Sequence, residues 1–465
     1  MLRRELLLTI TSLLFLQTWT FAQTPTAPAC SSSLTSKMIC VVPQTYGPNG
    51  LVLPNPRHNA HFVSSFQENF VPLTVSVGTE LTLLSIASPA SGVLFTFDPT
   101  LGVVTRSNES YGPILTERAE TIGRHKLYLA GTYQFYDFSS LDGVDLKHIP
   151  VVFSHAQFPI GGTTPTFEQD FITTDNRIDL KVHQVTFYAT YGLTSRIDVS
   201  AAVPVLNVRL SAVSNAQIVR VQPEPVPPTD PNFGSSVNGF FHYFIPGDPA
   251  NSTSATFCNG TIDAASCPSR TATGIGDVVF RVKGTVVKLE RARVALGLDV
   301  RTPTGDEQNF LGAGAVGVKP FIAASYRARV SPHANLGFEW NGDSLLAGNV
   351  ATGSSGKLPN QFFYSGGVDV GITKRLTVAA DLLGQRLSST ERIRQTAFVD
   401  SQGVTHPEIS QIQLFKDSAN IDDFSIGAKV NPIGNLLITA NVLFKLNDPG
   451  LRAKVVPLVG ISYSF

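Results

Sequence analysis

Charged residues are scarce in this sequence. Only 15% of its 465 residues are Asp, Glu, Lys or Arg, whereas a soluble domain usually carries about 25%. Lys+Arg and Asp+Glu number 35 each, so the formal net charge is zero. Because the chain lacks a basic surplus, we expect no nucleic-acid partner. The 38 Gly, 30 Pro and 30 Phe, against only 2 Trp, indicate much strand and turn and a wide apolar exterior.

Long apolar runs are missing beyond the N-terminus. Residues 1–22 have the arrangement of a secretory signal peptide, with Arg3 and Arg4, an apolar segment at 6–16 and a cleavage site after Ala22. An uncleaved membrane anchor is the alternative. After it, no stretch reaches the roughly 18 consecutive apolar residues of a transmembrane helix. The sequence therefore predicts an exported chain that crosses no membrane as a helix.

Cysteine is also rare, and catalytic motifs are absent. The four cysteines form two local pairs, Cys30 with Cys40 and Cys258 with Cys267, and such pairs in an exported chain predict two disulfides rather than a metal site. No H-E-x-x-H, G-x-S-x-G or P-loop pattern occurs. We therefore expect no enzyme, no metal and no cofactor. A hydrolase that uses His333 with nearby Ser331 is the enzymatic alternative.

Segments of about ten alternating residues fill the chain from residue 91 to its end. The clearest are 291–301, 335–341, 375–382, 435–446 and 453–465. Short connectors alternate with long ones, as in a barrel with short periplasmic turns and long outer loops. The pattern predicts an all-β fold, a transmembrane antiparallel up-and-down β-barrel of about 14 strands at 91–465. We expect it in the bacterial outer membrane, in contact with lipid, with the strand that ends at Phe465 recognised by the barrel-assembly machinery.

Two stretches depart from regular alternation. Between Ile178 and Gly192 the apolar residues change face, which we interpret as a bulge near His183–Gln184. Residues 23–90 are Pro- and Ser-rich at first. Leu73, Val77 and Leu81 then recur at helical spacing, although the same stretch also alternates like a strand. A short helix that plugs the barrel and a periplasmic tail are both compatible with this segment.

Charged residues in the strands fall on the face opposite the apolar one. On the lipid face, Arg or Lys would cost about 2–4 kcal/mol at mid-bilayer, so we expect these residues to line the lumen. They are Asp277, Arg281, Lys283, Arg293, Asp299, Arg301, Glu339, Asp369, Arg375, Asp381, Lys429 and Lys445. Since both signs share one layer, they form either a pore lining that selects solutes or a packed salt-bridge network without an open channel.

Several motifs resemble a known family of barrels. They are Gly274-Ile275-Gly276-Asp277-Val278, Gly297 to Asp306 (GLDVRTPTGD), Ser331 to Gly342 (SPHANLGFEWNG), Gly112 to Gly123, and Leu141 to Leu146 (LDGVDL). The chain is similar there to the phenol-degradation meta-pathway outer-membrane family, most strongly over 270–345 and more weakly over 90–465. The resemblance implies an outer-membrane barrel that passes small, often hydrophobic, organic molecules.

Two functions fit these observations. The first is passive passage of small, hydrophobic or aromatic organic solutes through the lumen. The second is a surface-interaction or structural barrel whose long loop at 211–273 binds a partner. That loop carries a Pro run at 223–228 and an aromatic cluster at 240–244, and exposed aromatics often anchor partners. Alternatively, the cluster packs down over the barrel mouth.

Overall fold

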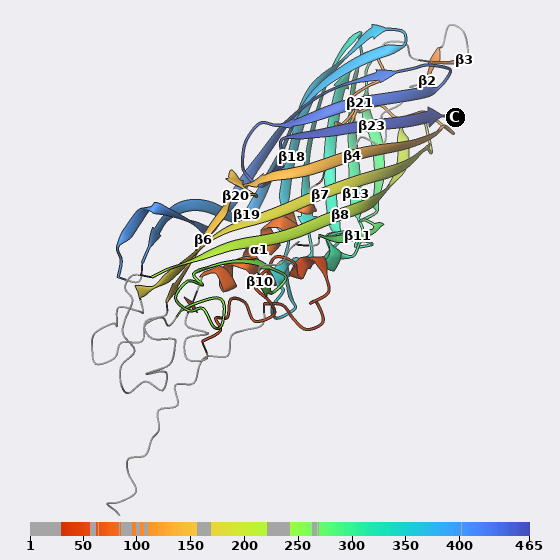
Figure 1. The fold of residues 1–465 in the computed structure, drawn as a ribbon. Coiled ribbons are helices and arrows are strands. Elements are labelled where there is room, and N and C mark those ends of the chain that lie inside the picture. Colours follow the sequence, from red (N-terminus) through yellow and green to blue (C-terminus); the bar gives the residue numbers. More distant parts are fainter. Residues whose placement is uncertain are drawn as a thin grey trace, which may run out of the picture.

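A closed ring of antiparallel strands organises the molecule (Figure 1). The computed structural model describes residues 29–55, 62–63, 65–82, 84, 95–98, 103–106, 110–155, 169–220, 242–262, 267, 269–400 and 402–465. Within these ranges, twelve strands form the ring in chain order. They are β4 (Leu127–Leu141), β7 (Phe171–Gly192), β8 (Ile197–Val219), β12 (Val279–Lys288), β13 (Ala292–Arg301), β14 (Gly317–Tyr326), β15 (Val330–Asn341), β18 (Gln361–Thr373), β19 (Leu376–Val399), β20 (Thr405–Val430), β21 (Leu436–Lys445) and β23 (Val455–Ser464). Pairing of β23 with β4 closes the sheet, which leaves no free edge.

The antiparallel barrel is confirmed, but the predicted number of about 14 strands is wrong. The ring begins at Leu127 rather than near residue 91. The preceding β2 (Phe95–Asp98) and β3 (Val103–Arg106) form a hairpin of their own, and residues 110–122 run inside the barrel. Alternation upstream of Leu127 therefore does not report ring strands.

Shorter strands extend the ring at one end. β11 (Arg270–Ile275) prolongs β12 along β8, and β22 (Leu451–Ala453) prolongs β23 along β4. The others are β1 (Phe62–Val63), β5 (Val144–Asp145), β6 (Ile149–His155), β9 (Ser254–Cys258), β10 (Thr261–Ile262), β16 (Asp343–Asn349) and β17 (Ser354–Lys357), with the 3-10 turns η1 (Met38–Cys40) and η3 (Glu307–Asn309). Because β8 runs on to Val219 and β11 starts at Arg270, the loop between them is shorter than 211–273.

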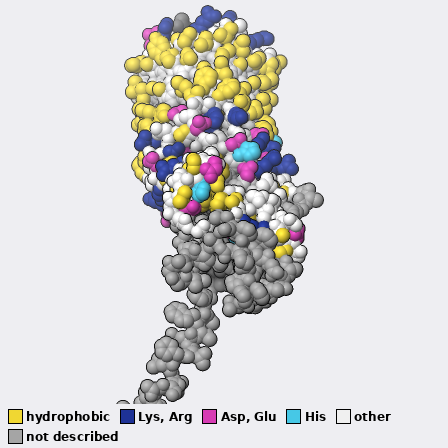
Figure 2. Space-filling model, turned by 60° about the vertical axis from the view of Figure 1, so that its left-hand side comes forward, with side chains coloured by type: hydrophobic (Ala, Val, Ile, Leu, Met, Phe, Trp, Pro, Cys, Tyr) yellow, Lys and Arg dark blue, Asp and Glu magenta, His cyan; other side chains and the backbone are white. Residues whose placement is uncertain are grey.

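An apolar belt surrounds the barrel next to the end that carries the short turns (Figure 2). Along the strands, the alternate positions that are predicted to face lipid are exposed. On β13, for example, Leu296 and Leu298 are exposed on the outer face, whereas Ala295 is buried. Phe280, Val282 and Ile426 continue the belt. Only a closed barrel can present such a belt to hydrocarbon with all its backbone groups paired. The chain is thus an outer-membrane β-barrel whose short turns face the periplasm.

The change of face on β7 marks the edge of this belt. Val182 is buried inside, whereas Phe187 is exposed outside. The bulge predicted at His183–Gln184 is wrong, because β7 pairs with β8 residue by residue from Phe171 to Gly192. On β8 the change occurs opposite, where Val208 pairs with Val182 and is also buried inside. On the periplasmic side of this level the outer face meets lipid; on the other side, towards the outer mouth, the outer face meets water and the inner face packs on protein.

Residues 29–55 pack on the inner face of the strand extensions at the outer end. The Tyr46 ring lies edge-on to Phe153 and Phe257 at 5.5 and 5.0 Å, and its hydroxyl hydrogen-bonds Ser214 at 2.5 Å. Both predicted disulfides are confirmed, Cys30–Cys40 within this segment and Cys258–Cys267 beside β9. The N-terminal segment is therefore fixed to the outer mouth.

The aromatic cluster proposed as a partner anchor is partly turned inward. Phe244 is buried against Phe257, with ring centroids 5.4 Å apart, and His242 is buried with Nδ1 2.7 Å from Asp170 Oδ2. These two side chains pack down over the barrel mouth. Phe240, Phe241, the Pro run and the signal segment 1–22 lie outside the described residues.

The predicted helix is present as α1 (Ser65–Leu81) and lies among the strand extensions of the outer mouth (Figure 1). Ser76 Oγ donates to the Glu391 carbonyl at 2.9 Å. Gly78 lets the helix approach closely, since a Cβ there would lie 2.9 Å from Leu346 and 3.0 Å from Phe310. In the described part of the chain, no helix has the length and apolar character to cross a membrane.

Candidate functional site: the barrel lumen

A cavity of about 240 Å³ lies in the lumen between two internal segments. Thr82 and Leu84, which follow α1, border it on the outer side. Residues 115–117 border it on the periplasmic side. Its wall combines apolar and charged side chains, which include Phe321, Phe363, Leu383, Arg281, Asp299, Arg301, Lys319 and Glu339. The space therefore suits a small molecule with an apolar body and a few polar groups.

The outer layer of charges centres on Arg301. Its Nη1 is 3.0 Å from Asp277 Oδ2, and its Nη2 is 3.1 Å from Glu339 Oε1. Asp277 also accepts from the backbone of Gly305 at 3.0 Å and of Ala313 at 2.7 Å. The predicted charges at this level thus pair with one another and tie down the turn between β13 and β14.

The inner layer joins three strands to a segment that the alternation did not single out. Arg281 forms a fork with Asp299 at 2.6 and 2.7 Å and also pairs with Glu117. Lys283 Nζ is 2.7 Å from the other Glu117 oxygen, and Lys319 Nζ is 3.4 Å from Asp299. Charged groups in low dielectric need such partners.

Glu117 belongs to the inner loop, our name for residues 110–122, which lies in the periplasmic half of the lumen. Wall side chains bind its backbone. Lys283 Nζ donates to the carbonyls of Arg118 and Glu120 at 2.9 and 2.8 Å, and Asn335 Nδ2 donates to that of Glu117 at 2.7 Å. Lys429 Nζ donates to the carbonyls of residues 111–113. Two of the predicted lumen lysines therefore hold a strap inside the barrel.

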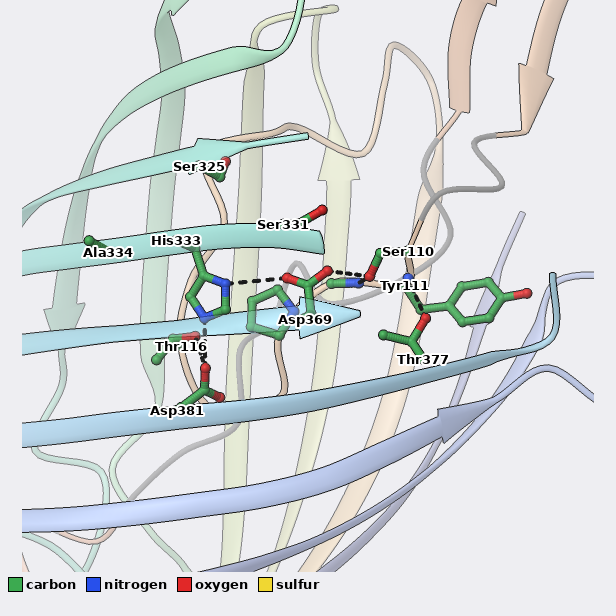
Figure 3. Close-up of polar contacts among 12 residues, drawn as sticks. Ser110, Tyr111, Thr116, Ser325, Ser331, His333, Ala334, Asp369, Thr377 and Asp381 are labelled. Carbon is green, nitrogen blue, oxygen red and sulfur yellow. Dashed lines mark hydrogen bonds and ion pairs between the residues drawn. The ribbon is translucent and has the colours of Figure 1, made fainter. Parts of the chain in front are cut away.

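His333 forms a second anchor point for the inner loop (Figure 3). Its Nε2 is 2.6 Å from Asp381 Oδ1, and its Nδ1 is 3.2 Å from Asp369 Oδ1. The same carboxylates reach the loop, since Thr116 Oγ1 donates to Asp381 at 3.1 Å and Ser110 donates to Asp369. The imidazole thus bridges two wall strands behind the strap.

The geometry around Ser331 does not support the hydrolase alternative. Ser331 Oγ donates to the Ala328 carbonyl at 2.6 Å, whereas both ring nitrogens of His333 face carboxylates. In Figure 3 the Ser331 hydroxyl points away from the imidazole. A nucleophile activated by His333 would need a hydrogen bond between the two side chains.

The remaining predicted lumen residues lie at the ends of the barrel. Arg293 is buried near the periplasmic end, and Arg375 is exposed in the turn between β18 and β19. Lys445, at the outer end, is 2.7 Å from Asp448 Oδ1. The other nine of the twelve predicted residues are the six of the two central layers, Asp369 and Asp381 at His333, and Lys429 at the inner loop.

At the outer mouth, α1 presents a buried carboxyl group. Glu80 is 7% exposed, and burial, with a smaller contribution from Asp142, raises its pKa from 4.5 to about 8. Arg452 and Arg392 act in the opposite direction. Asp142 itself accepts from Arg392 Nε and from the backbone of Ile393, both at 2.9 Å. The helix end therefore sits on a charged junction between β4, β19 and the 450 turn.

The sequence singled out Gly112 to Gly123 as a motif and His333 as a possible catalytic residue, but it did not predict that this segment lies inside the barrel or that His333 helps to hold it there. Only the known structure reveals the signal for Glu117 in the sequence. On three neighbouring strands, the three cations Arg281, Lys283 and Lys319 meet only one carboxylate, that of Asp299. An unbalanced cationic layer inside a barrel requires an acidic partner from elsewhere. No group of three or more His, Cys, Asp or Glu side chains in the described residues has the geometry to hold a metal ion.

Comparisons with known proteins show likeness in fold. No family model matches the sequence, and no curated protein matches it. The COG4313 outer membrane channel from Pseudomonas putida F1 is similar, with 10% identity over 75% of this chain and 99% of that chain, at a TM-score of 0.43. The toluene transporter TbuX of Ralstonia pickettii is 12% identical over 75% of this chain and 92% of that chain, at a TM-score of 0.26. At these scores, the nature of the barrel follows from its own closed ring and apolar belt.

Proposed function

We propose that this barrel is an outer-membrane channel through which small organic solutes diffuse. The observation that carries the proposal is the cavity of about 240 Å³ in the lumen, bordered by Thr82 and Leu84, which follow α1, and by residues 115–117 of the inner loop. Its wall offers Phe321, Phe363 and Leu383 to an apolar body. The family resemblance of the motifs points to the same class of solute.

Polar groups at the cavity fit uncharged, hydrogen-bonding solutes. The predicted charges Arg281, Asp299 and Arg301 are already paired, so they make the wall polar without presenting a free charge. Gln385 Oε1, at the cavity, is buried and has no hydrogen-bond partner in the described structure. A solute hydroxyl would satisfy such an acceptor.

The inner loop and α1 act in this proposal as a plug that closes the resting channel. Only non-covalent contacts with wall side chains hold the loop inside the lumen, so it can leave the lumen while the strands of the ring stay paired. Passage then requires a population in which the loop has moved. The plug predicted within residues 23–90 corresponds in this proposal to α1 at the outer mouth, and the inner loop is a second plug that the sequence did not predict.

Liposome swelling with small uncharged organic solutes tests the proposal. Ala202 is buried and borders the cavity, whereas Ala201 is on the opposite, lipid-facing side of the same strand. We expect Ala202→Trp to slow swelling and Ala201→Trp to leave it unchanged. Equal rates in the wild type, both variants and protein-free liposomes would show that the barrel is sealed and would end the proposal.

A further inference from the structure

The periplasmic rim of the barrel carries a strong excess of positive charge. The rim consists of the chain connections at residues 123–126, 193–196, 288–291, 327–329, 374–375 and 431–435, all of them described. Its basic residues are Arg124, Lys126, Arg196, Lys288, Arg291, Arg327, Arg329, Lys374 and Arg375. Within these six ranges Glu290 is the only acidic residue. Since the whole chain is neutral, this end is strongly polarised, and Lys and Arg gather there in Figure 2.

The positive charges are placed around the ring rather than on one side. They occupy five of the six connections, from the approach to β4 through the β18–β19 turn. Of these six, only the connection 431–435 carries no Lys or Arg. A partner protein would dock against one sector. Lipid headgroups, in contrast, surround a barrel on all sides.

Apolar and aromatic side chains mark the rim as the level of the headgroups. Tyr326, Leu289 and Ile372, next to the basic turns, are exposed on the outer face. Tyrosines of this kind sit where hydrocarbon meets headgroups. Cationic side chains beside them reach the phosphate layer with their stems on apolar surface.

One rim arginine is fixed by the fold in this position. Arg329 Nε donates to the Gly371 carbonyl at 3.1 Å, and its Nη2 donates to that of Ile372 at 3.4 Å. These bonds hold the guanidinium across the gap between the β14–β15 turn and β18. Arg196, Arg291 and Lys374 are exposed to either side of it.

We propose that this basic rim binds the headgroups of anionic phospholipids in the periplasmic leaflet. The rim attracts them by its summed charge, and the outward apolar residues fix their depth. The interaction does not depend on solute passage, so it stands or fails separately from the proposed channel function.

Spin-labelled lipids in reconstituted membranes test the proposal by measuring which lipids occupy the barrel surface. We expect the wild type to prefer phosphatidylglycerol over phosphatidylcholine by at least about twofold, and the preference to weaken as salt is added. The rim variant R196Q/R291Q/K374Q should lose it. The matched control R386Q/R394Q/K416Q removes three exposed cations from the outer β19–β20 hairpin and should keep it.

Several results would overturn the proposal. One is a wild type without preference, and another is an equal loss in the control variant. If the wild type shows no lipid preference but binds polyglutamate through the rim, the partner is an acidic polypeptide instead. Should the triple variant fail to fold, judged by heat-modifiable gel mobility, the three single variants are measured. Each should then lower the preference by part of the total, and unchanged preference in all three would also refute the proposal.

Discussion

Replacing Lys283 by Met should open the channel. Its Nζ lies 2.7 Å from Glu117 Oε1 and donates to two carbonyls of the inner loop, and the side chain is 1% exposed. Met keeps the length of the side chain but offers no donor. The variant therefore removes one cationic partner of Glu117, which keeps its ion pair with Arg281, and leaves the carbonyls of Arg118 and Glu120 without this donor.

The magnitude follows from these contacts. Removing one partner of a buried ion pair costs about 3–5 kcal/mol. The ring keeps its backbone ladder, so most of this cost falls on the docked position of the inner loop. Each 1.4 kcal/mol corresponds to about a tenfold change in an equilibrium constant. The ratio of undocked to docked loop should thus rise by about two to three orders of magnitude.

Open probability in planar bilayers measures this change. We expect K283M to be open far more often than the wild type, while heat-modifiable gel mobility shows an intact barrel. Lys288→Met is the matched control, because Lys288 lies on the same strand but is exposed at the periplasmic rim. The double variant E117Q/K283M should close again in part, since removing one charge of each sign restores the charge balance of the lumen. A folded K283M barrel with wild-type open probability would refute the role of this anchor.

Three further predictions follow. Val282→Arg places a cation on the lipid face of β12 and should destabilise the barrel by about 2–4 kcal/mol in urea unfolding from vesicles; unchanged stability would mean that this face does not meet lipid. Because the docked pKa of Glu80 is about 8, above its ordinary 4.5, docking of α1 is strongest below pH 4.5 and weakens as the pH rises towards about 8. Solute influx should rise over that window in the wild type and stay flat in Glu80→Gln; parallel curves would contradict it. Cys258→Ser with Cys267→Ser should cost about 2–4 kcal/mol of outer-end stability, seen as faster proteolysis of that region, while the membrane belt keeps its melting temperature.

The closed barrel could be predicted from the sequence because lipid imposes a two-residue period on every ring strand. The cost of a charge in hydrocarbon likewise predicts that Arg281 and Asp299 face inward, and in the structure the two side chains are only 15% and 4% exposed and pair with each other at 2.6 Å. The strand number could not be predicted, since local alternation does not say whether a segment pairs in the ring or lies inside it. The phase change on β7 was visible, but its cause was not. The cause is that residues 29–55 pack on the inner face of the strand extensions outside the membrane, so that apolar side chains face inward there.

The pairing of the lumen charges also limits what can pass. In the two ion-pair layers of the lumen, with the inner loop docked, Arg281, Lys283, Arg301 and Lys319 are balanced by Glu117, Asp277, Asp299 and Glu339, four charges of each sign. An ion that enters gains nothing from a balanced wall and must still shed water, which is costly in a narrow lumen. An uncharged organic molecule sheds little water and gains contact with Phe321 and Phe363. In the proposed channel, the docked network therefore favours neutral solutes at the cavity, whereas departure of the inner loop removes Glu117 and leaves Lys283 without this partner.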